Sequence, residues 1–288
     1  LATALLFAGL SSAWNIVGGF GGQFSLAHSV FFAVGAYTMA NLYLKAGISP
    51  WLGLVPAAIL AAALACLLSW PLFRLRGPFF AIATMAFTEV ALALGNYMEW
   101  LTGGTRGLSI PFRLGVANMI FRDRLSYAVL MLGFATLCLL VVLAVHRSRL
   151  GYYLQAVRDN EQAAAASGIP VLEVKLTGMA ISAALTGIGG ALFFMQVRVA
   201  DPAALLSLFD FGVKFALIAL IGGLGTIYGP ILGALVVIPL EGWLRATLGG
   251  VLPGANLIVL SLCLILASLF MRHGIVGALS AAVRRVRR

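Results

Sequence analysis

Long apolar runs are the feature that most constrains how this chain can fold. A helix crosses the hydrocarbon core of a bilayer in about 20 apolar residues, and nine runs of roughly that length follow one another along the sequence. They lie at 1–20, 24–44, 51–73, 78–99, 126–145, 177–198, 211–228, 230–247 and 256–271. The runs are continuous and do not alternate with polar residues, which favours helices over a β-barrel. The sequence therefore predicts an all-α polytopic membrane protein in which 1–288 form a single transmembrane domain.

The composition agrees with this prediction and excludes several classes of protein. Hydrophobic residues make up 62% of the chain and charged residues only 10%, against about 25% charged in ordinary soluble domains. A soluble fold has too little interior for this much apolar surface, so we exclude a soluble enzyme, a nucleic-acid-binding module and a disordered chain. The three cysteines lie far apart without metal-ligand spacing, and we expect neither a disulfide nor a bound metal.

Basic residues indicate which side of the membrane each connection faces. Placing 146–176 and the C-terminus in the cytoplasm puts 11 of the 19 Lys and Arg residues on that side, as the positive-inside rule prefers. The clearest element is the basic tail 272–288, which follows the last predicted span and also suits anionic lipid headgroups. Nine spans with an inside C-terminus place Leu1 outside, so we expect a tenth span upstream of Leu1.

The stretch 146–176 is too polar to span a membrane and is predicted to be a cytoplasmic loop. Within it, Gln155 to Ser167 is predicted to form a short helix, because Ala163–Ala166 have high helix propensity. Gly168 is expected to end this helix, and Pro170 to prevent its continuation. Taken alone, the segment suits either a surface that another protein grips or an idle connector between spans.

Several stretches carry a resemblance to a known family. The loop reads Arg158-Asp159-Asn160-Glu161-x-Ala163-Ala164, followed by Gly168-Ile169, and it resembles the coupling loop of ABC importer permeases. More specifically, it is similar to the membrane subunits of branched-chain amino-acid importers. The segment Gly22-Gln23-Phe24-Ser25-Leu26-Ala27-His28 is similar to an early signature of that family, which often has Gly where this chain has Ala27. Further matches are Arg76–Ile82, Thr102–Leu108, Ile221–Thr226, Gly229-Pro230 and Gly233-Ala234.

The resemblance implies an ABC importer permease without catalytic residues. This chain and a second related permease would form the pathway for branched-chain amino acids, and a periplasmic binding protein would deliver them. Two ABC ATPase subunits would bind the loop and hydrolyse ATP-Mg, because this chain has no Gly-x-x-x-x-Gly-Lys-Ser/Thr phosphate loop and binds no cofactor itself. The implied location is the prokaryotic inner membrane, with a cytoplasmic C-terminus. The implied coupling residues are Arg158, Asp159, Asn160, Glu161, Ala163, Ala164 and Gly168.

Glycines near the spans leave two interpretations open. Gly225, Gly229 and Gly233 repeat every four residues, so on one helix they would line a face and permit close packing. Alternatively, glycine-rich stretches break helices beside the pathway, since unwound backbone is tolerated where it lines a cavity. The candidates for such breaks are Gly22, Gln23, Gly222, Gly223, Gly225 and Thr226. Both interpretations can hold at once.

Isolated polar side chains in the spans are further candidates, because such groups usually face a bundle interior or water. Ser25 suits the pathway, whereas His28 suits either the pathway or an interhelical hydrogen bond. Glu89, in the middle of its span, suits either the pathway or a structural partner. Lys214 and Glu241 lie near predicted span ends, where their polar heads are expected to reach the interface.

Three other functions are weighed against the importer subunit. A permease for urea or short amides would share the same motifs. An ion-coupled secondary transporter would need a cluster of charged residues within the membrane, where Glu89 is nearly alone. A membrane enzyme would need a catalytic or metal motif, and the spans contain no HExxH, no Ser/Lys dyad and no DxxD-like pair. The outer stretch 101–125, with several arginines, suits a docking surface or a solvated loop equally well.

Overall fold

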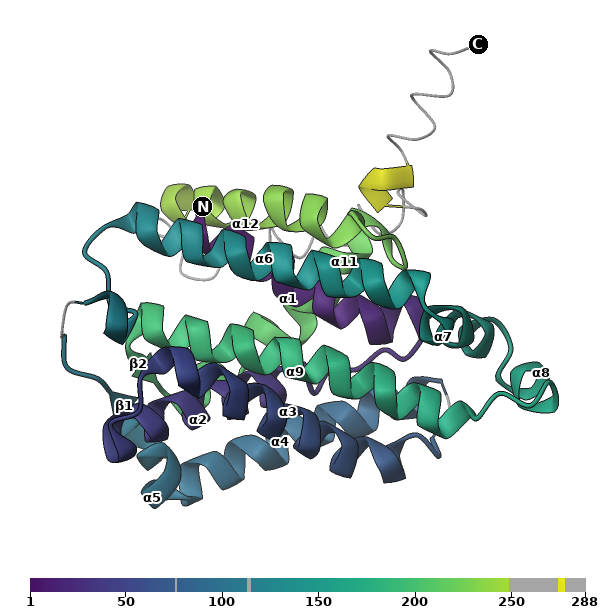
Figure 1. Ribbon diagram of the computed structural model, residues 1–288, viewed down its shortest axis with the longest axis horizontal. Helices are drawn as coiled ribbons and strands as arrows, with labels where there is room; N and C mark the ends of the chain where they lie inside the picture. Colours follow the sequence, from purple (N-terminus) through teal and green to yellow (C-terminus); the bar gives the residue numbers. More distant parts are fainter. Residues whose placement is uncertain (76, 113–114, 249–273, 278–288) are drawn as a thin grey trace, which may run out of the picture.

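Long helices run between two ends of the molecule (Figure 1). The computed structural model describes residues 1–75, 77–112, 115–248 and 274–277. In chain order the helices are α1 (Ala2–Asn15), α2 (His28–Ala46), α3 (Pro50–Leu72), α4 (Pro78–Tyr97), α5 (Glu99–Thr102), α6 (Arg124–Arg147), α7 (Arg149–Asp159), α8 (Glu161–Ala166), α9 (Val171–Val197), α10 (Pro202–Leu205), α11 (Lys214–Gly223) and α12 (Gly229–Leu248). We refer to the two ends by the elements that lie there, as the α7–α8 end and the β1–β2 end.

Short elements complete the chain between these helices. The strands β1 (Leu108–Ser109) and β2 (Val199–Ala200) pair antiparallel, with Leu108 opposite Ala200. A π-helical turn extends α1 over Ile16–Phe20, and a second one, Leu208–Val213, leads into α11. The strand pair joins the connection after α5 to the connection after α9, so it ties two loops together at one end of the molecule.

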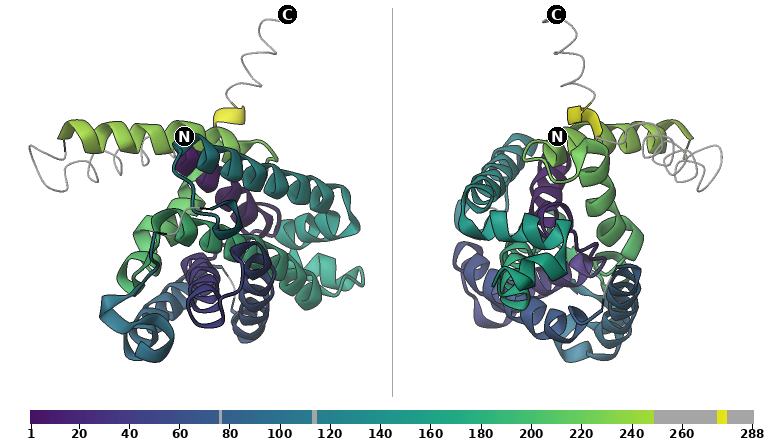
Figure 2. Two further views of the ribbon diagram at one scale, coloured as in Figure 1. Left: turned by 60° about the vertical axis from the view of Figure 1, so that its left-hand side comes forward. Right: turned by 90° about the vertical axis from the view of Figure 1, so that its right-hand side faces the viewer.

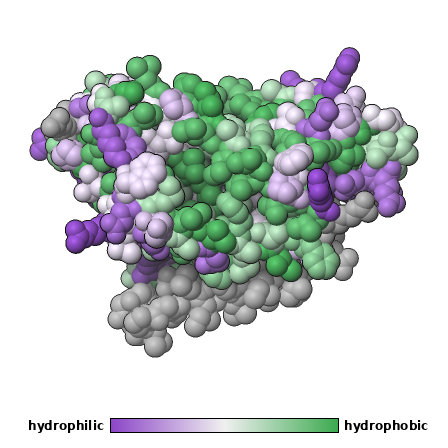
Figure 3. Space-filling model, turned by 90° about the horizontal axis from the view of Figure 1, so that it is seen from below, coloured by the Kyte–Doolittle hydropathy of each residue, from purple (hydrophilic) through white to green (hydrophobic). Residues whose placement is uncertain are grey.

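Seven helical stretches in the described residues are long and apolar enough to cross a membrane. They are Ala2–Phe20, Pro50–Leu72, Pro78–Tyr97, Arg124–Arg147, Val171–Val197, Pro202–Gly223 and Gly229–Thr247. These stretches correspond to seven of the nine predicted spans, which supports a multi-pass helical membrane protein. In Figure 3, hydrophobic residues fill the middle of the exposed face and hydrophilic residues gather towards its two ends.

The remaining two predicted spans are not among those seven, so the count of nine is not confirmed. The span predicted at 24–44 corresponds to α2, which carries Ser29, Thr38 and Asn41 and packs against both α3 and α9. The span predicted at 256–271 lies outside the described residues. The basic tail 272–288 also lies outside them, apart from 274–277.

The first helix forms the centre of the molecule. In the span that contains α1, 89% of the residues are buried, against 17% in the span of α4. Every residue of α1 from Leu6 to Asn15 is buried, so the helix is enclosed on all sides, as expected of a largely apolar helix in the interior of a bundle. It packs against α6, α9, α11 and α12, and Figure 2 shows α12 and α4 on opposite sides of the bundle.

Glycines in α9 allow it to lie directly on two neighbouring helices. A Cβ atom at Gly187 would overlap the backbone carbonyl of Ala57 in α3. A Cβ atom at Gly190 would overlap the carbonyl of Phe32 in α2 in the same way. Small residues let helix backbones approach closely, so these two positions fix α9 against the α2–α3 pair.

Candidate functional site

The predicted loop 146–176 is a pair of short helices between the ends of two long ones. Its first two residues belong to α6 and its last six to α9, with α7 and α8 between them. The single helix predicted from Gln155 to Ser167 is wrong, because the chain breaks at Asn160. The backbone of Asn160 is extended (φ −159°, ψ 104°), and its Oδ1 accepts hydrogen bonds of 3.0 Å from the amides of Gln162 and Ala163. Asn160 is therefore the N-cap of α8.

The end of α8 is where the sequence predicted it. Gly168 has φ +84°, and the amide of Ile169 donates back to the carbonyl of Ala164. A glycine is favoured at this position because side chains rarely adopt such a backbone conformation. Of the two alanines predicted to mediate coupling, Ala164 is buried and Ala163 is exposed. The pair of helices therefore presents a small-residue surface to the outside.

An ion pair joins α8 to the first turns of α9. Lys175 Nζ lies 2.8 Å from Glu161 Oε2, and the side chain of Lys175 is only 2% exposed while that of Glu161 is 33% exposed. The same ammonium group lies over the ring of Phe73 at the end of α3. A buried ammonium group needs a partner, so Glu161 neutralises Lys175 and fixes α8 to the bundle.

Arg158 connects the loop helices to the interior. Its Nη1 donates to the carbonyl of Gly19 at 3.1 Å, and its Nη2 pairs with Asp159 at 3.0 Å. A Cβ atom at Gly22 would collide with the Arg158 side chain, and one at Gly225 would lie 3.2 Å from Nη1. Arg158 thus touches two glycine-rich segments that lie far apart in the sequence.

Both of those segments are breaks between helices. After the π-helical turn of α1, residues 22–27 are unwound, so α2 begins at His28 and not at 24 as predicted. The span predicted at 211–228 ends at Gly223, and residues 224–228 form the second break. Leu224 is extended (ψ 135°) and Gly225 has φ +73°. The predicted break residues therefore lie at or beside observed breaks, while their role in a pathway stays a prediction.

Asn15 joins the end of α1 to the second break, and the sequence analysis missed it. Its Nδ2 donates to the carbonyl of Thr226, and its Oδ1 accepts from the amide of Gly225, both at 2.9 Å. The side chain is fully buried. A signal was available, because an amide inside an otherwise apolar span needs a polar partner.

Close helix packing was predicted for Gly225, Gly229 and Gly233 on one helix face, and only Gly229 and Gly233 lie on the same helix. Gly225 lies in the break before α12, so it shares no helix face with Gly229 and Gly233. A Cβ atom at Gly233 would overlap the carbonyl of Ile218, and one at Gly222 would overlap that of Gly229. The close contact is therefore between α11 and α12.

His28 lies in a chain of hydrogen bonds at the first break. Ser182 Oγ in α9 donates to the carbonyl of Ala13 at 2.7 Å, so it accepts from His28 Nε2, 2.9 Å away. The other ring nitrogen, Nδ1, lies 3.2 Å from Ser25 Oγ, and it accepts from that hydroxyl when the ring is neutral. All three polar side chains are fully buried. This geometry joins α1, α2 and α9, and it places Ser25 and His28 in an interhelical contact.

The remaining two polar candidates lie apart from this network. Gln23 is partly exposed in the first break, with its Nε2 3.5 Å from the carbonyl of Gly21. Glu89 is exposed on α4. The structure therefore does not bring Glu89 together with the break residues.

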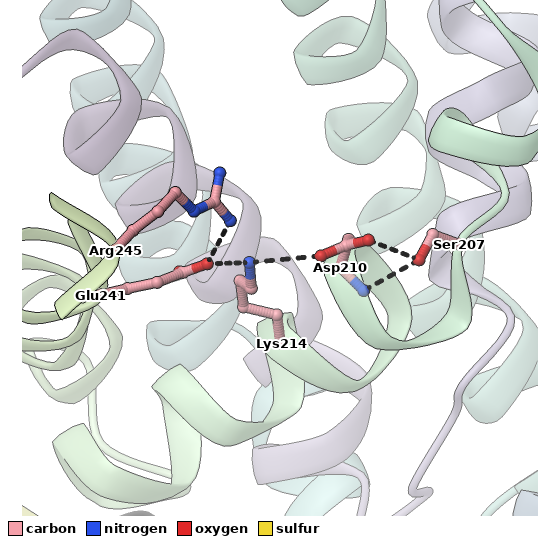
Figure 4. Close-up of polar contacts among 5 residues, drawn as sticks. All are labelled: Ser207, Asp210, Lys214, Glu241 and Arg245. Carbon is pink, nitrogen blue, oxygen red and sulfur yellow. Dashed lines mark hydrogen bonds and ion pairs between the residues drawn. The ribbon is translucent and has the colours of Figure 1, made fainter. Parts of the chain in front are cut away.

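Charged side chains at the β1–β2 end form a cluster that the sequence analysis did not predict (Figure 4). Glu241 Oε1 lies 2.9 Å from Lys214 Nζ and 3.2 Å from Arg245 Nη2. Lys214 also approaches Asp210, which accepts a hydrogen bond from Ser207. Glu241 is 8% exposed, and its carboxylate is paired with both cations. The cluster borders a cavity of about 720 Å³.

Nothing in the described residues resembles a metal centre. In the parts of the chain that the structure describes, His, Cys, Asp and Glu side chains form no group of three or more that could hold a metal ion. The described residues contain seven candidate membrane spans, two breaks between helices, and a pair of loop helices from which Arg158 donates a hydrogen bond to Gly19 beside the first break.

Comparison with known proteins gives the family. The chain belongs to the family described as branched-chain amino acid transport system / permease component, which matches residues 1–269. It is 31% identical over 249 residues to the LivM high-affinity branched-chain amino acid transport permease of Escherichia coli K12, covering 78% of this chain and 58% of that protein. It is 27% identical over 184 residues to a probable LivM permease of Methanocaldococcus jannaschii, covering 64% of this chain and 53% of that protein.

A second kind of permease also matches. The LivH high-affinity branched-chain amino acid transport permease of E. coli K12 is 24% identical over 250 residues, covering 81% of this chain and 79% of that protein. The chain spans little more than half the length of the LivM relatives. No solved structure matches the chain.

Proposed function

We propose that this protein is the transmembrane subunit of an ATP-binding-cassette importer and forms part of the pathway for branched-chain amino acids. The observation that carries the proposal is the bond from Arg158 in the loop helices to Gly19 at the first helix break. A protein that grips α7 and α8 would move Arg158, and with it the backbone beside both breaks. Family membership supports the same function.

The proposed mechanism is a rigid-body shift that starts at the loop helices. Two ATPase subunits on the cytoplasmic side bind the exposed surface of α7 and α8 and hydrolyse ATP-Mg. The Glu161–Lys175 pair transmits the displacement to α9, and Arg158 transmits it to the two breaks. This chain contributes no catalytic group to the reaction. Its own contribution is a connection between the loop helices and the membrane helices.

The other proposed partners complete an importer of the inner membrane. A second, related permease would form the other half of the pathway, and a periplasmic binding protein would deliver the substrate at the β1–β2 end. The names of the relatives favour branched-chain amino acids as the substrate. A permease for urea or short amides is the alternative that an uptake experiment must exclude.

Deletion of the gene tests the proposed transport directly. We expect the deletion strain to lose binding-protein-dependent uptake of radiolabelled leucine, isoleucine and valine, and the tagged full-length chain to restore uptake and to copurify with ATPase subunits. Loss of urea uptake with leucine uptake intact would establish the alternative substrate. Absence of any copurifying ATPase would contradict the importer itself.

Two variants of α8 test the coupling. Glu161→Arg places a cation beside the buried Lys175, so we expect substrate-stimulated ATPase activity in proteoliposomes to be abolished while membrane insertion persists. Gln162→Arg places the same side chain on an exposed neighbour whose amide donates to Asn160 and which takes no part in the ion pair, and we expect it to keep most of the stimulation. Equal stimulation in both variants would refute the role of the ion pair. Gly168→Trp, at the end of α8, is expected to abolish coupling as well.

A further inference from the structure

The charged cluster at the β1–β2 end is a row of alternating charges beside a cavity. In Figure 4 the row runs from Arg245 through Glu241 and Lys214 to Asp210. All four side chains line the cavity of about 720 Å³, and Asp201 lines it as well. This volume falls in the range of roughly 300–1,000 Å³ that is typical of small-molecule sites. Among the described residues, the charged side chains of the lining are therefore three carboxylates and two cations.

The middle pair of the row holds two helices together. Lys214 Nζ lies 2.9 Å from Glu241 Oε1, and the two side chains are only 15% and 10% exposed. Buried charges need partners, so this pair joins the start of α11 to α12. The pair satisfies Glu241 without any contribution from Asp210.

Asp210, at one end of the row, makes a looser contact. Its Oδ1 lies 3.9 Å from Lys214 Nζ, and its side chain is 56% exposed. An exposed pair of this kind contributes little to stability. In an α-amino acid the ammonium nitrogen and the carboxylate oxygens are bonded through one carbon and lie about 3 Å apart. Such a molecule could therefore lie alongside this pair, with its carboxylate against Lys214 and its ammonium group against Asp210.

Aromatic rings form an apolar wall next to the same pair. Phe7, Phe193 and Phe211 line the cavity. The ring centroid of Phe211 lies 6.0 Å from that of Phe7 and 5.5 Å from that of Phe193. Lys214 Nζ lies 5.6 Å from the centroid of Phe7. A mostly apolar lining with a few placed polar groups is typical of a small-molecule site, and here it would receive an apolar side chain beside a charged head.

We propose that this cavity binds an α-amino acid as a zwitterion with an apolar side chain, with Lys214 binding the carboxylate and Asp210 the ammonium group. The inference rests on the proposed function and deepens it, because the site selects an amino acid over urea. Urea is neutral and offers a charge to neither residue. A ligand that lacks one of the two charges leaves one of these side chains without its partner, which is a strong source of discrimination.

Protection of a cysteine tests binding in the cavity. Ala204 on α10 is exposed and lines the cavity, whereas Ala203 is exposed outside the lining. Each is replaced by cysteine in an otherwise cysteine-free full-length chain, copurified with its partner subunits into phosphatidylcholine nanodiscs. We expect L-leucine to slow the maleimide labelling of Ala204→Cys and not that of Ala203→Cys.

Analogues of leucine identify the groups that are recognised. Leucinol lacks the carboxylate and isocaproate lacks the ammonium group, so each should need a concentration about tenfold higher than leucine for the same protection. Urea should give none. Absence of protection by leucine, or protection by urea at the same concentration, would overturn the proposal.

A variant of Asp210 separates binding from packing. Asp210→Asn keeps an acceptor for the hydroxyl of Ser207 but loses the charge. We expect it to raise the leucine concentration for half-protection of Ala204→Cys about tenfold and to leave that of isocaproate unchanged. Asp123→Asn, exposed just before α6, is the control and should change neither. An equal loss for both ligands in Asp210→Asn would refute the assignment of the ammonium group.

A lipid headgroup is the other source of the same chemistry, because phosphatidylethanolamine carries an ammonium group and a phosphate. Protection without leucine that appears when this lipid is added to the nanodiscs would assign the cavity to lipid and overturn the proposal. Failure of leucine uptake and of ATPase copurification would remove the proposed function. Intact leucine uptake without protection of Ala204→Cys by leucine would remove the cavity site alone.

Discussion

At the scale of single residues, buried hydrogen bonds determine where the helices meet. The chain of bonds through Ser25, His28 and Ser182 has one consistent direction, because Ser182 already donates to the carbonyl of Ala13. The bond to Ser182 therefore requires a proton on His28 Nε2. Asn15 has a similar role at the second break, where it satisfies one donor and one acceptor of the unwound backbone.

A pair of serine variants measures the contribution of this network. Ser182→Ala removes the acceptor for His28 Nε2 and leaves a buried donor unpaired, which costs about 1–3 kcal/mol. Ser11→Ala is the matched control, because Ser11 Oγ in α1 is buried and has no hydrogen-bond partner among the described residues. We expect Ser182→Ala to lower the melting temperature of the detergent-purified protein and Ser11→Ala to leave it unchanged or raise it. A similar melting temperature for both variants would contradict the network.

At the scale of secondary-structure elements, close contacts between backbones replace large interdigitating side chains at several crossings. α9 lies on α2 and α3 through Gly190 and Gly187, and α12 lies on α11 through Gly233. Without a hydrophobic driving force between helices in lipid, such close packing is a main source of association.

Variants of two glycines in α12 distinguish the contribution of helix packing to stability from the contribution of helix propensity. At Gly233 an added Cβ would overlap the carbonyl of Ile218, whereas at Gly242 it would meet no atom within 4 Å in the part of the chain that the structure describes. Gly233→Ala is therefore expected to force α11 and α12 apart and to destabilise the protein. Gly242→Ala should be neutral or stabilising by up to about 1 kcal/mol, because alanine is the better helix former. Thermal unfolding in detergent compares the two, and the opposite order of stability would be evidence against the packing.

At the scale of the whole molecule, the long helices connect two ends that consist of different short elements. One end holds the loop helices α7 and α8, and the other holds α5 and the paired strands (Figure 1). If the molecule spans a membrane along its long helices, these ends lie on opposite sides. From the positive-inside rule we predict that the α7–α8 end faces the cytoplasm.

Labelling of single cysteines tests this arrangement. Ser167 directly follows α8 and Thr105 lies between α5 and β1, and both are exposed. Because these elements lie at opposite ends, each residue is replaced by cysteine in a chain from which Cys66, Cys138 and Cys263 have been removed. A membrane-impermeant maleimide should label Thr105→Cys in intact spheroplasts and Ser167→Cys only in inverted vesicles. Labelling of both positions from the same side would overturn the proposed topology.

Several features of this protein could be predicted from the sequence alone, because they depend on local chemistry. The membrane spans follow from the transfer of continuous apolar segments into lipid, and seven of the nine predicted runs are candidate spans in the structure. The end of α8 at Gly168 follows from a backbone conformation that glycine favours. The resemblance to the family depends on short sequence motifs that follow one another in a fixed order along the chain.

Only the tertiary structure decided which polar groups meet. Asn15 bonds to Gly225, His28 to Ser182 and Lys214 to Glu241, and the two members of each pair are distant in the sequence. A local pattern shows that a polar group needs a partner, but the partner depends on how the helices pack. For the same reason the sequence could not show that Arg158 reaches both helix breaks or that Glu89 lies exposed on α4, because burial and contact are properties of the assembled bundle.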